Sequence, residues 1–71
     1  MVIGSTDVAA RVHEALMEDP RTRNAVVDVA FERGIATLTG TVASEEVRQA
    51  AEEVARQTSG VVTVVNELRL K

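Results

Sequence analysis

The chain contains no cysteine, tryptophan or tyrosine, and it has one proline and one phenylalanine. Without cysteine, neither a disulfide framework nor thiolate chemistry is available to the protein. Because Phe31 is the one aromatic residue, the hydrophobic core has to be built from valine, leucine and alanine. Apolar residues still make up 45% of the 71 residues, so the sequence predicts one small globular domain.

Positive charge is also scarce, since eight Lys and Arg residues face eleven Asp and Glu residues, giving a net charge of −3. This balance disfavours nucleic acid as a partner and simple electrostatic docking on an anionic bilayer. No apolar run approaches the length of a membrane span. The apolar residues 1–4 are too short for a signal peptide. We therefore expect a cytoplasmic protein, or else a mature form or an excised domain of a larger one.

The stretch from residue 26 to residue 42 predicts two antiparallel strands, at 26–32 and 35–42, joined by a two-residue turn at Arg33-Gly34. Apolar residues alternate along both strands and mark one face of each. The turn sets a register in which these faces coincide; it places Val27 opposite Gly40, Val29 opposite Leu38, and Phe31 opposite Ala36. A type I′ turn would give Arg33 a left-handed backbone, at a cost of about 1 kcal/mol. A longer, bulged loop is the alternative.

Two helices flank this hairpin. The first is expected at about 6–18, capped by Ser5 or Thr6 and ended before Pro20. The second is expected to begin after the cap Ser44 and to stop at Ser59-Gly60, with Gly60 as a left-handed cap.

A third strand is expected at 61–70. Its alternation places one set of apolar residues toward the core, namely Val62, Val64, Leu68 and Leu70. Asn66 interrupts this set, and we expect its amide to bond to the backbone of a nearby loop.

The resulting order is αββαβ. A right-handed crossover makes the third strand parallel to the second, but the sequence leaves open whether it pairs beside the first or the second strand. Both helices should cover one face of the three-stranded mixed sheet, which predicts a two-layer α+β sandwich. Residues 1–5 form a tail and residues 6–71 a single domain.

Several short motifs carry a resemblance to a known family. They are Asp19-Pro20, Val27-x-Val29, Gly34-x-Ala36-Thr37-Leu38-Thr39-Gly40-x-Val42 and Gly60-Val61-x-x-Val64-x-Asn66-x-Leu68. In this order, from about Asp7 to Leu70, the chain resembles the BON domain, named for bacterial osmotically induced and nodulation-related proteins. It departs from the family at Ala36, where valine is frequent, and at Arg33, where Asn or Asp is common.

The resemblance implies an αββαβ fold and a non-enzymatic module associated with phospholipid membranes. BON domains often occur in envelope or stress-response proteins, frequently in tandem or beside other domains. The chain is therefore expected to be cytoplasmic or an excised domain of an envelope or periplasmic protein. The resemblance transfers no catalytic residue and no cofactor.

No catalytic or metal-binding pattern stands out from the residues themselves. His13 is the one histidine, and its carboxylate neighbours lack zinc-ligand spacing, so we expect an exposed helix residue. Adjacent glutamates on a helix point in different directions and do not suit shared acid–base chemistry. Gly34, Gly40 and Gly60 are too far apart for a phosphate-binding loop and are interpreted as structural turn or cap glycines. We therefore expect no enzyme, no metal and no cofactor.

Two surfaces remain as candidate binding sites. The first, for phospholipid headgroups, lies where one end of the sheet should bring together Arg21, Arg23, Arg69 and Lys71; a solvated rim is the alternative. The second is the sheet face that the helices leave bare, with the candidate interface residues Val26, Ile35, Val61 and Val65. Ordinary exposed strand residues are the alternative there. The function predicted is a non-catalytic module at a phospholipid surface; the alternative is a protein-interaction or homo-oligomerisation module, such as a weak homodimer.

Overall fold

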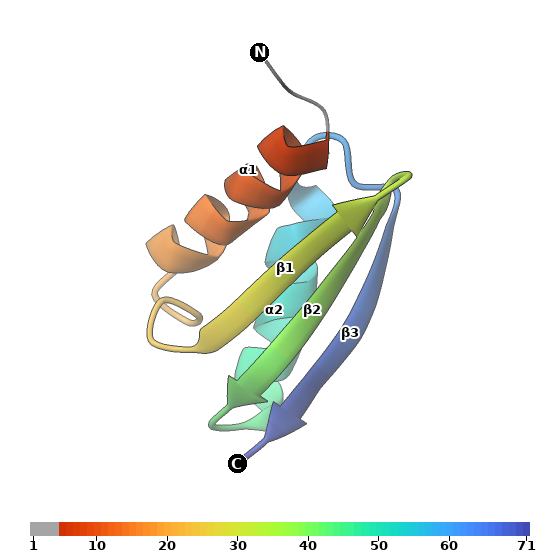
Figure 1. Cartoon of the computed structure of the whole chain (residues 1–71). Coiled ribbons are helices and arrows are strands. Elements are labelled where there is room, and N and C mark those ends of the chain that lie inside the picture. Colours follow the sequence, from red (N-terminus) through yellow and green to blue (C-terminus); the bar gives the residue numbers. More distant parts are fainter. Residues whose placement is uncertain (1–4) are drawn as a thin grey trace.

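The computed structural model describes residues 5–71, with side chains from Val8 onward. Its elements are α1 (Ser5–Glu18), β1 (Val26–Glu32), β2 (Ile35–Val42), α2 (Glu45–Gln57) and β3 (Thr63–Leu70). The two helices cover one face of the three-stranded sheet (Figure 1), which confirms the predicted αββαβ, α+β fold. Helix α1 begins one residue earlier than predicted, and its predicted cap by Ser5 or Thr6 lies outside the described side chains.

Strand β2 is the central strand, with β1 antiparallel on one side and β3 parallel on the other. The fold therefore decides the pairing that the sequence left open. The predicted hairpin register is confirmed at all three pairs, Val27–Gly40, Val29–Leu38 and Phe31–Ala36. Arg33 and Gly34 have φ values of 54° and 83°, so the turn is the two-residue type with both central residues left-handed, and no bulge is needed.

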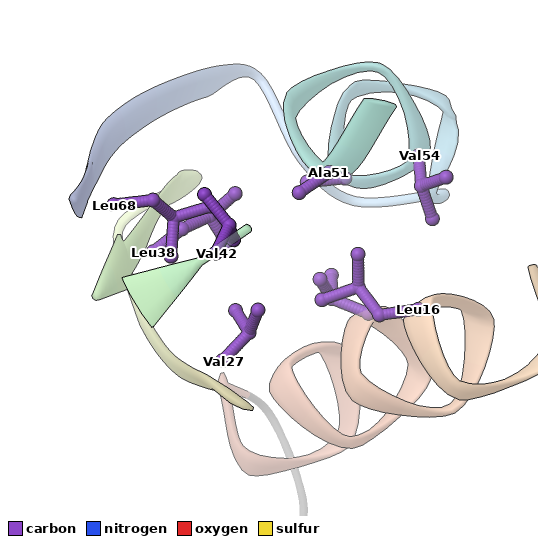
Figure 2. Close-up of a cluster of buried hydrophobic side chains, with 9 residues drawn as sticks. Leu16, Val27, Leu38, Val42, Ala51, Val54 and Leu68 are labelled. Atoms are coloured by element: carbon purple, nitrogen blue, oxygen red, sulfur yellow. The ribbon is translucent and has the colours of Figure 1, made fainter. Parts of the chain in front are cut away.

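The core lies between the sheet and both helices (Figure 2). Its fully buried large side chains include Leu38 and Val42 on β2 and Val12 on α1. As the composition predicts, it consists of valine, leucine and alanine, and Phe31 is only half-buried outside it. The sequence did not predict that Thr22 is buried. Its hydroxyl donates a 2.6 Å hydrogen bond to the Leu16 carbonyl, and this bond connects the chain after α1 to the end of the helix.

The start of the third strand differs from the prediction. Strand β3 begins at Thr63; Val61 packs against the core cluster, whereas Val62 is 81% exposed. Both Val62 N–H and Thr63 N–H donate to the Gly34 carbonyl, so the alternation of strand side chains begins only after Val62. The placements of Val61 on the bare face and of Val62 toward the core are therefore wrong. Leu70, predicted toward the core, is also half exposed, at the far end of the edge strand.

The second helix is capped as predicted at its start, where the Ser44 hydroxyl accepts a hydrogen bond from Val47 N–H. Its C-cap is Thr58 and not Gly60. Gly60 does have the expected positive φ, 99°, but it acts two residues later, where the chain turns from α2 toward β3.

Candidate functional site

The sheet face opposite the helices, called here the open sheet face, is a grid of four rows across β1, β2 and β3. From the hairpin turn downward the rows are Glu32–Ile35–Thr63, Ala30–Thr37–Val65, Asp28–Thr39–Glu67 and Val26–Thr41–Arg69. Most of these side chains are exposed, because both helices pack on the other face.

Apolar side chains on this face are not spread evenly. Ile35 and Val65 lie in the two rows near the turn and are 42% and 39% exposed. Val26 lies in the row farthest from the turn, two rows beyond that of Val65, and is 71% exposed. Between them the acidic Asp28 and Glu67 flank Thr39. The structure thus places three of the four predicted interface residues on the open sheet face, in two separate groups.

The β3 edge of the sheet is less available than its face. Along β3, the Asn66 side chain accepts a hydrogen bond from Leu68 N–H (3.1 Å), and Arg48 Nε donates to the Leu68 carbonyl (3.3 Å). Asn66 Nδ2 donates in turn to the Arg48 carbonyl and to Glu52 on α2. The predicted structural role of Asn66 is therefore confirmed, although its partners belong to a helix and to its own strand. Side-chain hydrogen bonds to edge backbone groups are a common protection against strand addition. At the opposite edge of the sheet, β1 contacts α1 on the core side.

The four predicted basic residues lie at the end of the sheet away from the hairpin turn, here called the basic end. Arg21 and Arg23 belong to the connection before β1, while Arg69 and Lys71 lie at the end of β3. They do not form one cluster. Arg69 lines a hollow with Glu67 on the open sheet face, whereas Arg21 and Lys71 line a separate hollow. Arg23 lines neither.

Arg21 is already held by carboxylates. Its guanidinium donates through Nε and Nη2 to Asp19 (both 3.1 Å) and through Nη1 to Glu53 on α2 (3.2 Å). The hydrogen bonds from Arg21 lower the pKa of the Asp19 carboxyl below its ordinary value, and they raise the pKa of Arg21. By contrast, Arg23, Arg69 and Lys71 form no ion pair with the side chains described for residues 8–71.

A family model described as the BON domain matches residues 5–71, nearly the whole chain. The chain belongs to the BON domain family. A solved structure of CdsD, a structural protein of the type III secretion system of Chlamydia trachomatis, superposes on this BON domain with a TM-score of 0.78 and 22% identity. The alignment covers 99% of this chain and 33% of that one, and at this identity it supports the fold alone. A comparison with curated proteins finds no match.

Family membership supports a non-catalytic binding module. Among the described residues, no three His, Asp or Glu side chains are close enough together to hold a metal ion. His13 is exposed on α1, as expected for a solvated helix residue. Neither described helix is long and apolar enough to cross a membrane.

Proposed function

We propose that this BON domain binds the surface of phospholipid bilayers through its basic end. The observation that carries the proposal is the exposed Val26 at the same end of the sheet as three cations that form no ion pair with the described side chains. They are Arg23 before β1, Arg69 in the same row of the sheet, and Lys71 beyond it. Apolar and cationic groups side by side suit a bilayer surface, where the apolar group enters the headgroup layer and the cations meet phosphates. Because the net charge is −3, the attraction is local and weak.

The expected result is binding to vesicles that contain phosphatidylglycerol, weaker binding to pure phosphatidylcholine vesicles, and loss of binding as salt rises. A cation near the surface contributes about 1 kcal/mol, so Arg69→Gln with Lys71→Gln should weaken vesicle affinity roughly 30-fold. The measurement is vesicle co-sedimentation at low salt.

The matched control is Arg33→Gln with Arg56→Gln. This pair removes the same charge from the hairpin turn and from the last turn of α2 and should change affinity little. No vesicle binding by the wild type, or equal losses in the two double variants, would contradict the proposal.

A second candidate function is self-association through the open sheet face. Its support is the exposed Ile35 and Val65 in adjacent rows, on the sheet face that the described helices leave uncovered. Burying such a face against a second copy would remove apolar surface from water at about 25 cal/mol per Å², before the costs of association. Two-fold symmetry is the commonest closed arrangement, so the occupant is a second BON domain of the same sequence. The acidic Asp28 and Glu67 keep the association weak.

For this candidate, light scattering should show the apparent molecular mass rising toward that of a dimer as the protein concentration approaches the millimolar range. Ile35→Glu with Val65→Glu should abolish the dimer, because four carboxylates would then face one another in a dry contact. Thr39→Glu with Thr41→Glu adds the same charge to the central strand outside the rows of Ile35 and Val65 and should weaken the dimer less. A wild type that remains monomeric near millimolar concentration would rule this candidate out.

A further inference from the structure

A hollow with a largely apolar lining lies at the basic end. It is bounded by the α1–β1 connection, the end of β2 and the first turn of α2. Its apolar walls include Ala25, Val26, Val42, Ala43 and Val47. Arg21 and Lys71 also line it, with two neutral polar residues and no Asp or Glu. Four other hollows on the described residues each include at least one Asp or Glu side chain.

Arg21 lines this hollow and also the acidic hollow along α2 that includes Glu46 and Glu53, so it contributes hydrogen-bond donors more than net charge. A guanidinium carries five N–H groups, and the hydrogen bonds to Asp19 and Glu53 occupy one on each of its three nitrogens. Two N–H groups therefore remain for a ligand. The same bonds hold the side chain in place, so little rotamer freedom is lost when an anion is bound.

Lys71 supplies a second cationic side chain. Its backbone N–H donates to the Val42 carbonyl (3.0 Å), which continues the pairing of β3 with β2 and keeps this residue beside the hollow. Its ammonium forms no ion pair with the described side chains.

The size of the hollow limits what enters it. Its volume is about 230 Å³, below the roughly 300–1,000 Å³ of sites that enclose a whole drug-sized ligand. Apolar walls favour an alkyl group inside, and the cationic rim favours an anion at the mouth. A short length of one chain fits this volume, whereas a complete two-chain phospholipid does not.

We infer that the hollow seats the head-proximal part of a single alkyl chain, with its terminal anionic group between Arg21 and Lys71. The inference rests on the proposed function, which it deepens by naming a ligand class. A fatty-acid carboxylate and a lysophospholipid phosphate both have this chemistry.

The test is an NMR titration of the wild-type chain with dodecyl phosphate and with dodecanoate, each below its micelle concentration. Both compounds should shift the backbone amide resonances of Ala25, Ala43 and Val47. Tighter binding of dodecanoate would indicate a fatty-acid carboxylate as the natural anion, and tighter binding of dodecyl phosphate would indicate a lysophospholipid phosphate. Dodecyltrimethylammonium has the same chain with the opposite charge and should bind at least tenfold more weakly. Equal binding of the cation and the anions, or shifts confined to the open sheet face, would overturn the inference.

Filling the hollow gives the matched pair of variants. Ala43 is exposed at the hollow, so Ala43→Leu should fold normally and weaken dodecyl phosphate binding at least tenfold. Ala30→Leu adds the same group to an exposed alanine on β1, in a hollow that contains Glu32, and should leave binding unchanged.

Vesicle binding separates this inference from the proposed function. Vesicle binding that persists while dodecyl phosphate fails to bind would overturn the hollow as a site and leave the surface function standing. Dodecyl phosphate bound in the hollow by a chain that ignores vesicles would overturn the surface function and support the site.

Discussion

Replacing Leu38 by alanine should lower the free energy of unfolding by about 2–5 kcal/mol. Leu38 lies in the middle of the central strand, its side chain is fully buried, and it belongs to the cluster that joins the sheet to both helices. Truncation would remove buried methyl groups and leave a cavity that the strands on either side of β2 prevent from collapsing. A domain of this size has roughly 4–10 kcal/mol of stability in total, so this one change would remove a large share of it.

The matched control is Thr39→Ala, one residue along β2 and exposed on the open sheet face. It should change stability by no more than about 0.5 kcal/mol. Because the chain has no tryptophan, urea unfolding followed by far-ultraviolet circular dichroism is the suitable measurement. Equal losses at the two positions would mean that the alternation of β2 is wrong.

Gly40→Ala should be as damaging, for a backbone reason. Gly40 has a φ of 135°, which side-chain-bearing residues rarely adopt, and a Cβ at this position would lie 2.1 Å from the Val26 carbonyl oxygen. An unfavourable φ costs about 1–3 kcal/mol, and forcing neighbouring backbone apart costs a similar amount. We expect a loss of about 3–5 kcal/mol, with β1 displaced at its start.

Gly34→Ala is the comparison that isolates the backbone contact. Gly34 also has a positive φ, 83°, but its added Cβ would meet only the side chain of the exposed Val62, at 3.0 Å. Because that side chain can move, the loss should be about 1 kcal/mol. The same urea titration ranks the two variants, and a Gly34→Ala loss as large as that of Gly40→Ala would contradict the argument.

Much of this fold follows from local patterns. The two-residue turn at Arg33-Gly34 and the period-two alternation on either side allow one register in which the apolar faces coincide, and the structure has that register. Ser44 begins the second helix because its hydroxyl satisfies a backbone N–H of the first turn, a contact that depends only on neighbours in sequence.

Other features depend on contacts between distant segments. The sequence marks Gly40 as a strand glycine, but only the pairing with β1 brings the Val26 carbonyl to the place that a Cβ would occupy. The last turn of α2 and the Gly34 carbonyl set the backbone of Val61 and Val62, so the strand pattern read through these residues placed both on the wrong face.

The binding surfaces show the same division. Sequence order places four cations at one end of the sheet, because β1 begins where β3 ends. It does not show that Asp19 and Glu53 hold Arg21, or that Arg21 and Lys71 share an apolar hollow while Arg69 lies on the open sheet face. Local patterns determine which elements form and how the hairpin pairs, since those depend on neighbouring residues. The tertiary structure alone decides which charges remain without a partner, because an ion pair such as Arg21–Glu53 joins residues that only packing brings together.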